Sequence, residues 1–200
     1  MLLAHQRAVA EATAAWKLPI DAPVPFSYRW EHVQEVVRLA CWLAEQLAAD
    51  SEVVEAAAWL HDVCKGQPKH ALAGAAEAEH FLPTTDFPAA KIPAVLAAIR
   101  EHEGLYRKVN ASPLEPLETA ILWDADKLSK LGVQALAFSL STVYHAGLTL
   151  RQRRENMLDF LENSLSRTVE SMNTKPARRA AKQRYKNMVT VLTLWQEEEE

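Results

Sequence analysis

The chain has 200 residues, which is enough for one well-buried core but too short for two comfortable domains, so the sequence predicts a single domain with terminal helical extensions. Hydrophobic residues make up 49% of the chain and only 5 residues are glycine, a composition that favours an all-α fold. The formal net charge of −4 gives no electrostatic reason to expect a nucleic-acid polymer as partner. We therefore expect a small-molecule partner.

The cysteines and the N-terminal residues indicate the cellular compartment in which we expect the protein. Cys41 and Cys64 stand alone inside helical patterns, which argues against a disulfide framework and for a reducing environment. The first residues turn polar at His5, too soon for the apolar core of a signal peptide. No window is long and apolar enough to predict a membrane span. We expect a cytoplasmic protein with no membrane association; its oligomeric state does not follow from the sequence.

Apolar residues recur at three- and four-residue intervals along most of the chain, a pattern that predicts α-helices. In chain order, helices are predicted over residues 2–16, 28–49, 52–65, 70–82, 92–102, 116–131, 132–146, 150–173 and 176–197. Pro19, Pro23 and Pro25 predict an extended connector after the first helix, which we expect to be a peripheral buttress. Gly66 is suited to end the third helix in the left-handed conformation.

Adjacent His61 and Asp62 close the apolar run of the third predicted helix, so both side chains should lie at the edge of a helical core. An imidazole and a carboxylate side by side offer one nitrogen and one oxygen ligand to a divalent cation, but two protein ligands rarely suffice. The further candidates are His32, His70, His102, Asp124 and Asp126.

The surroundings of these candidates support a metal site. His32 and His102 each extend an apolar helical stripe, and the two acids lie within the apolar run 121–128. A lone inward histidine is more often an ordinary core residue, but an unpaired buried carboxylate is costly. A helical core that gathers several such groups is explained more simply by metal ligation, with either Asp124 or Asp126 as a ligand.

Other chemistries fit less well. Gly66 stands alone, so the spacing excludes a P-loop or a dinucleotide fingerprint. The cysteines have no CxxC partner, and no strand-turn-helix elbow for a serine nucleophile is visible.

Five motifs, in order and at matching spacing, resemble the HD-domain superfamily of metal-dependent phosphohydrolases. They are Tyr28-Arg29-Trp30-Glu31-His32, Ala57-Ala58-Trp59-Leu60-His61-Asp62-Val63, His70 with Gly74-Ala75, Ala98-Ile99-Arg100-Glu101-His102, and Asp124-Ala125-Asp126-Lys127-Leu128. The segment Met172–Arg178, with Ala181 and Arg184, also resembles the C-terminal helices of a small single-domain branch. The likeness covers about residues 26–195.

The resemblance implies an HD-domain helical bundle with extra N- and C-terminal helices. We expect an N-terminal helix and Pro-rich connector over residues 1–25, an HD core over 26–146, and C-terminal helices packing on the core over 147–200. It also implies that a divalent metal ion binds a set of four ligands, namely His32, His61, Asp62 and Asp126. Asp124 is then expected to lie next to the ligands without binding the metal itself. Its position on the apolar face of the helix would, however, suit a ligand at least as well.

His70 and His102 lie where relatives with two metals place additional ligands, and where relatives with one metal contact phosphate. We favour phosphate contact, because only Asp62 is available to bridge two cations. Lys65 is expected to act with His61 and Asp62 in catalysis by holding a phosphate, although a cation at a helix C-terminus is an equally good interpretation.

Arg29 and Lys127 carry the same two interpretations as Lys65, while His5, His80 and His145 are expected to be ordinary histidines. The implied reaction is hydrolysis of a phosphoester or phosphoanhydride of a small molecule, with a nucleotide as the first candidate. Mixed nitrogen and oxygen ligation is compatible with Mn, Fe, Co, Ni or Mg. Two alternatives remain, namely an HD-fold di-iron oxygenase and an inactive module that binds metal and nucleotide.

Overall fold

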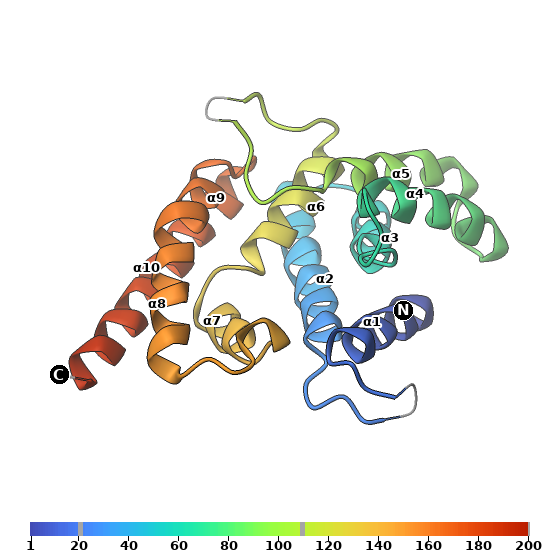
Figure 1. Cartoon of the computed structure of the whole chain (residues 1–200). Helices are drawn as coiled ribbons and strands as arrows, with labels where there is room; N and C mark the ends of the chain where they lie inside the picture. The colour runs from blue at the N-terminus through green and yellow to red at the C-terminus, as the bar shows by residue number, and fades with distance from the viewer. Residues whose placement is uncertain (20–21, 109–110, 200) are drawn as a thin grey trace.

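The computed structural model describes residues 1–19, 22–108 and 111–199, and within these residues the secondary structure is helical with no strand (Figure 1). The α-helices are α1 Leu2–Ala15, α2 Tyr28–Leu47, α3 Ser51–Leu60, α4 His70–Phe81, α5 Ile92–Glu101, α6 Leu117–Leu128, α7 Val133–Leu140, α8 Leu150–Phe160, α9 Ser166–Glu170 and α10 Lys175–Glu198. Short 3₁₀ turns cover Leu82–Thr84, Ala89–Lys91 and Val143–His145, and a π-helical turn covers Leu161–Leu165. The all-α prediction is confirmed.

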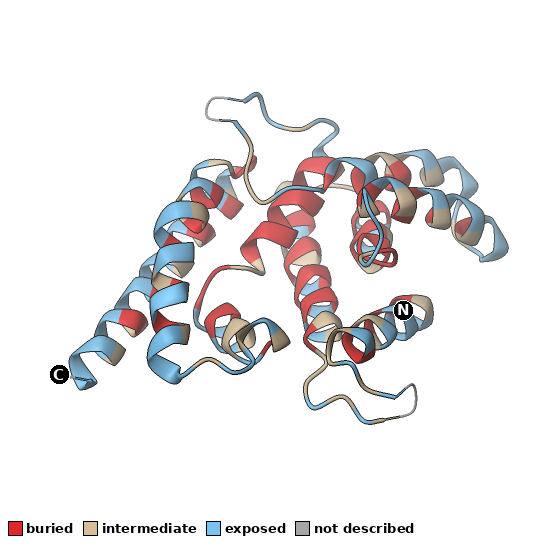
Figure 2. Ribbon diagram, viewed as in Figure 1, coloured by how far each residue is buried: buried red, intermediate tan, exposed pale blue. Residues whose placement is uncertain are grey.

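Helices α2 and α6 form the centre of the molecule. The apolar stripe of α2 is buried against α6 and α3, and Val36, Ala40 and Leu43 on it are completely inaccessible to solvent. In α6, every residue from Thr119 to Leu128 is buried, the charged ones included. Figure 2 shows the two helices as the most continuously buried part of the chain. Charged groups on α6 must therefore find partners inside the protein.

Helix α1 packs against α2, which is the position expected of a peripheral buttress. Ala4, Ala8 and Ala12 recur every fourth residue on its buried face, and their small side chains let the two helix backbones come close. None of the described helices is both long enough and apolar enough to cross a membrane.

The third helix is shorter than predicted. Asp50 begins α3 by accepting hydrogen bonds from the backbone N–H groups of Glu52 and Val53, but the α-helix ends at Leu60 rather than Lys65. The ring Nδ1 of His61 lies 2.7 Å from the carbonyl oxygen of Ala58, which an extended helix would use for the N–H of Asp62. The chain continues as a series of tight turns, with His61 and Asp62 just beyond the helix.

Gly66 does not take the predicted left-handed conformation; the residue that does is Lys69, with φ of 53°, immediately before α4. Gly66 instead faces the carboxylate of Glu11 on α1, and a Cβ atom at this position would collide with that side chain. This carboxylate is the far end of a flexible side chain that can move aside, so the contact does not by itself require a glycine at position 66.

Two later helices also end earlier than predicted. α6 ends at Leu128, where the guanidinium of Arg184 donates hydrogen bonds to the carbonyls of Leu128 (3.0 Å) and Leu131 (3.3 Å), and Gly132 follows with φ of 100°. α7 ends at Leu140 instead of continuing to residue 146. In the predicted segment 150–173, Thr149 and Gln152 form a capping box at the start of α8.

The C-terminal helices α8, α9 and α10 lie beside one another on the side of α6 away from α3 (Figure 1). Met157, Leu161, Leu165, Met188 and Leu192 are buried and fill the space between these helices and the rest of the molecule. α10 contacts α2, α6 and α7, so this C-terminal part packs directly on the elements that carry His32 and Asp126.

Candidate metal centre

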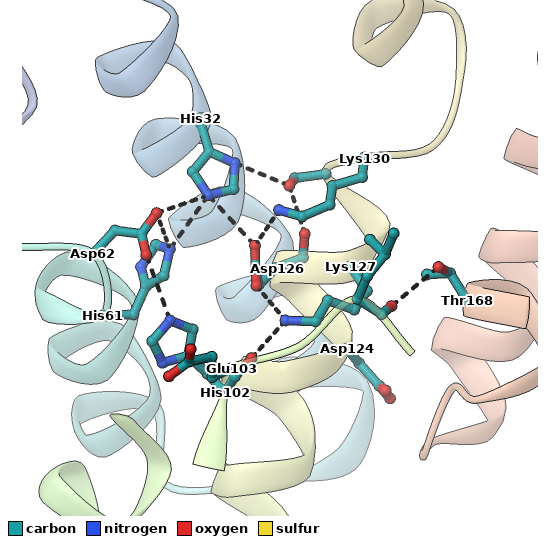
Figure 3. A network of polar contacts seen from close by, with 12 residues as sticks. His32, His61, Asp62, His102, Glu103, Asp124, Asp126, Lys127, Lys130 and Thr168 are labelled. Atoms are coloured by element: carbon teal, nitrogen blue, oxygen red, sulfur yellow. Dashed lines mark hydrogen bonds and ion pairs between the residues drawn. The ribbon is translucent and has the colours of Figure 1, made fainter. Parts of the chain in front are cut away.

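The structure brings six of the predicted site residues together from separate elements. His32 lies on α2, His61 and Asp62 follow α3, His70 begins α4, His102 follows α5, and Asp126 lies on α6. Four of them, His32, His61, His102 and Asp126, are at most 7% exposed. Figure 3 shows the side chains of His32, His61, His102, Asp62 and Asp126 pointing toward one another from these helices.

His61 and His102 are oriented by the ends of the helices that precede them. Nδ1 of His61 lies 2.7 Å from the carbonyl oxygen of Ala58, and Nδ1 of His102 lies 2.6 Å from that of Ile99. A carbonyl only accepts hydrogen bonds, so in both rings Nδ1 carries the proton and Nε2 presents a lone pair. Each histidine therefore turns a ligand nitrogen toward the cluster.

The ring of His32 is oriented through Ser129. The hydroxyl of Ser129 donates a hydrogen bond to the carbonyl oxygen of Asp126 at 2.6 Å, and its oxygen lies 3.1 Å from Nδ1 of His32. Since the hydroxyl proton is already used, Ser129 accepts from the N–H at Nδ1. Nε2 of His32 is then also free to present a lone pair.

These lone pairs converge on the carboxylate of Asp62. Its Oδ2 atom lies 3.5 Å from Nε2 of His32 and 3.6 Å from Nε2 of His61, while its Oδ1 atom lies 3.4 Å from Nε2 of His102 and 3.6 Å from Nε2 of His70. Both oxygens of Asp62 and Nε2 of His102 are buried and make no hydrogen bond with the described residues. Electron-rich atoms that face one another away from water are unfavourable unless a cation lies between them.

The donor atoms form two groups that share Asp62. His32, His61 and Asp62 offer ligand atoms within 4.8 Å of one another, and so do Asp62, His70 and His102. Oδ1 of Asp126 lies 3.4 Å from Nε2 of His32 and adds a further carboxylate to the first group. Imidazole nitrogens mixed with carboxylate oxygens suit divalent first-row metals. The residues present fit a divalent metal ion.

Four cationic side chains lie within 4.0 Å of the two carboxylates, namely Arg29 and Lys65 beside Asp62, and Lys127 and Lys130 beside Asp126. Arg29, Lys65 and Lys130 keep 19%, 25% and 31% of their side chains exposed, so a ligand can reach them. Lys127 is only 1% exposed and also donates a hydrogen bond to the carbonyl of His102 at 2.5 Å. Lys127 therefore contacts Asp126 and the backbone of His102 and does not face solvent.

The protonation states suit metal ligation. Burial lowers the pKa of His61 to about 3, and burial together with the nearby Lys130 lowers the pKa of His32. Burial alone would raise the pKa of Asp62 and of Asp126, but the positive charges of Lys65 beside Asp62 and of Lys127 and Lys130 beside Asp126 oppose it, and the pKa of each carboxylate is held well below the usual value. Metal ligands must be deprotonated, as these are.

Asp124 does not join the cluster. Its buried carboxylate accepts hydrogen bonds from the backbone N–H groups of Asn173 (2.7 Å) and Thr174 (2.8 Å) and from the side-chain amide of Asn173 (3.0 Å). Burial raises the pKa of Asp124, although these donors oppose the shift. Asp124 therefore ties α6 to the start of α10, and Asp126 is the acid of this pair that lies beside His32 (Figure 3).

The sequence did not single out Ser129, Lys130 or Glu103. Glu103 lies 3.7 Å from Nδ1 of His70, and Lys130 donates a hydrogen bond to Oδ1 of Asp126 at 2.7 Å. The spacing of Lys130, four residues after Asp126 on the same helical path, is the one available signal for such a pair. Ser129 carried no comparable signal.

Comparison with known proteins gives a family and a fold. The family model described as HD domain matches residues 29–131. Bacillus subtilis YpgQ in complex with ADP has a TM-score of 0.67 and 21% identity, and the match covers 98% of this chain and 97% of that one. An HD-superfamily hydrolase from Bacillus thuringiensis has a TM-score of 0.65 and 21% identity over 96% and 95% of the two chains.

A predicted HD superfamily hydrolase from an uncultured Thermotogales bacterium has a TM-score of 0.61 and 24% identity, with 100% of this chain and 92% of that one covered. No curated protein matches with significance. At these identities the solved structures show a common fold. The family match covers just over half of the chain, and the resemblance indicated by the five motifs is confirmed.

Proposed function

The chain belongs to the HD domain family, and from that premise we propose that it is a metal-dependent phosphohydrolase that cleaves a phosphoester or phosphoanhydride of a small molecule. The observation that carries the proposal is the buried carboxylate of Asp62, whose two oxygens lack hydrogen bonds and face histidine nitrogens on both sides. A nucleotide is the proposed substrate; the solved complex of Bacillus subtilis YpgQ with ADP supports this choice.

We assign one metal ion to His32, His61, Asp62 and Asp126, and a second position to Asp62, His70 and His102. The second assignment departs from the phosphate-contact role favoured by the sequence, because Asp62 turns a separate oxygen toward each group. Divalent ions held by these residues would polarise a phosphoryl oxygen and make a bound water more acidic at neutral pH.

The proposed roles of the nearby cationic residues follow from their solvent exposure and from their distances to the two carboxylates. Arg29, Lys65 and Lys130 are partly exposed cations beside the carboxylates, so each is available to bind phosphate oxygens, and Lys65 lies nearest Asp62 at 3.2 Å. Lys127 is buried and holds the carboxylate of Asp126 together with the backbone of His102. Its role is to keep the two sides of the cluster in place.

The test is metal analysis of the purified protein, followed by a panel of nucleotides and generic phosphoesters after metal removal and addition of Mn, Fe, Co, Ni or Mg. We expect release of phosphate or pyrophosphate from at least one nucleotide with at least one metal. His5→Ala, a change away from the cluster, serves as the control and should retain this activity.

Two outcomes would support the alternatives instead. Two tightly held irons with oxygen-dependent turnover would identify an HD-fold oxygenase. Stoichiometric metal and nucleotide binding without any turnover would identify a binding module.

A further inference from the structure

A cavity of about 380 Å³ adjoins the metal cluster, a volume in the usual range of small-molecule sites. It lies where α2 and the end of α6 meet α7, the Val143–His145 turn, α8 and α10. Among its lining residues are three groups, which are cationic, aromatic and neutral polar.

The cationic group faces the metal cluster. Arg29 and Lys130 line the cavity beside the neutral ring of His32, and all three also contact Asp62 or Asp126. Nε of Arg29 is buried and makes no hydrogen bond with the described residues. Among the described residues that line the cavity there is no aspartate or glutamate, so the cavity suits an anionic ligand.

The aromatic group covers the other walls. The ring of Phe138 lies 5.9 Å from that of Tyr28, the ring of Tyr144 lies 6.3 Å from Tyr28, and Phe160 faces the same space from α8. Tyr144 is 70% exposed and Phe160 is 37% exposed, so neither is committed to the core. Exposed aromatic rings around a cavity provide surfaces on which a flat ligand can stack.

Neutral polar groups complete the cavity. Ser139, Thr142 and Asn156 line it, together with His145, whose Nδ1 is buried and makes no hydrogen bond with the described residues. Such groups can donate to or accept from ring nitrogens and carbonyls, whereas an aliphatic ligand would leave them unpaired.

We propose that this cavity binds the flat heteroaromatic ring of the substrate and so determines specificity for nucleoside phosphates over phosphates that lack a ring. The proposal rests on the proposed function, since the metal cluster next to Arg29 and Lys130 is where the phosphate chain would lie. Stacking of the ring on Phe138, Tyr144 and Phe160 supplies affinity, and His145 and Asn156 are the groups that read its edge.

The walls of the cavity come from different parts of the sequence. Phe138, Tyr144, Asn156 and Phe160 all lie after residue 131, beyond the region that matches the HD domain. The matched region thus holds the phosphate-facing residues, while the C-terminal part supplies the ring-facing ones.

The test compares two ligands that differ in the ring and cannot be hydrolysed. These are adenosine 5′-(α,β-methylene)diphosphate, and methylenediphosphonate, which has the same two phosphorus groups without the nucleoside. Calorimetric titration of the manganese-loaded protein should show the nucleoside analogue binding at least about 5-fold more tightly, given about 1–3 kcal/mol per stacked base.

Phe138→Ala and Tyr144→Ala should each weaken binding of the nucleoside analogue roughly 5- to 100-fold and leave methylenediphosphonate within about twofold of wild type. Phe87→Ala, which changes an aromatic residue that does not line this cavity, should alter neither affinity. Tyr144 is exposed, so its replacement tests the cavity even where Phe138→Ala perturbs folding.

Equal affinity of the wild-type protein for the two ligands would overturn the proposal, and so would an equal loss of both in the cavity variants. Tight, ring-dependent binding by a protein that hydrolyses nothing would overturn the proposed function and leave the cavity assignment standing. Hydrolysis of phosphate compounds by a protein that binds both ligands equally would support the proposed function and overturn the cavity assignment.

Discussion

Nε2 of His102 lies 3.4 Å from Oδ1 of Asp62, and neither atom makes a hydrogen bond with the described residues. Because Nδ1 of His102 is bound to the carbonyl of Ile99, the close approach pairs a nitrogen lone pair with a carboxylate oxygen. The same relationship exists on the other side of Asp62, with His32 and His61. The cluster therefore presents two positions for a cation, one at each oxygen of one carboxylate. At Oδ1 the ammonium of Lys65 lies 3.2 Å from the oxygen and 3.1 Å from Nε2 of His70.

The first prediction concerns the residues at the centre. His61→Ala and Asp62→Ala should each abolish tight metal binding and hydrolysis, because each change removes a ligand from a site of about four protein ligands. Metal content measured by mass spectrometry after dialysis checks this. His80→Ala, a change at an exposed histidine of α4, should keep the wild-type content. Stoichiometric metal in both cluster variants would disprove the assignment.

The second prediction concerns the number of metals. His102→Ala and His70→Ala should each lower the metal content from about two ions toward about one per chain, since ligands of the second ion can be removed without dismantling the first position. If the two histidines contact only phosphate, the content will stay constant and the loss will appear in KM or kcat. A wild-type protein that holds one ion per chain would rule out the second position.

The third prediction separates the two acids of α6. Asp126→Ala should lose metal, whereas Asp124→Ala should keep most of it and lower the free energy of unfolding by about 3 kcal/mol, because N–H donors of Asn173 and Thr174 would lose their buried acceptor. Metal analysis and urea denaturation of the two variants check this. The opposite pattern would move the ligand from Asp126 to Asp124.

The fourth prediction concerns pH and Glu35. Burial alone would raise the pKa of Glu35, but Arg38 at 2.7 Å and Arg184 at 3.2 Å outweigh it and lower the pKa. A lowered pKa means that the carboxylate stabilises the fold above the unfolded-state pKa, near 4.3, and loses this contribution as the pH falls through the folded-state value.

At pH 6, Glu35→Gln should therefore be less stable than wild type by about 1–2 kcal/mol, and the difference should shrink below about pH 4. Urea denaturation at several pH values checks this. Glu45→Gln, a change at an exposed acid of the same helix, should show no such pH dependence. A Glu35→Gln difference that stays constant from pH 6 to pH 3 would contradict the expected role of the charge.

Much of the fold was predictable because the signals are local. His32 and His102 extend apolar stripes, and this periodicity placed both in the interior, as the structure has them. The helix ends were less accurate, since they depend on contacts from distant residues. The end of α6 depends on Arg184, and the end of α3 coincides with a hydrogen bond made by the ring of His61. Neither contact is visible in the sequence around the helix.

The candidate site also contains residues that the sequence predicts and residues that only the structure shows. Its histidines and aspartates were found by residue type and spacing, but the partner that orients His32 is Ser129, 97 positions away in the chain. Apart from Tyr28, the aromatic walls of the cavity come from several segments after residue 131, and each of these residues resembles ordinary core or surface packing when read alone. Only the assembled structure shows that they surround one space.

The hydrogen bonds between Asp124 and the start of α10 have a consequence for the choice of substrate. Asp124 and Asp126 lie two residues apart on one rigid helix, and α10 carries Met188 into the wall of the cavity. The distance between the cluster and the cavity is therefore fixed by α6 and by its hydrogen bonds to the start of α10. A ring held in the cavity would bring one particular phosphate to the cluster, so the protein would measure the length of a phosphate chain and cut it at a constant distance from the ring.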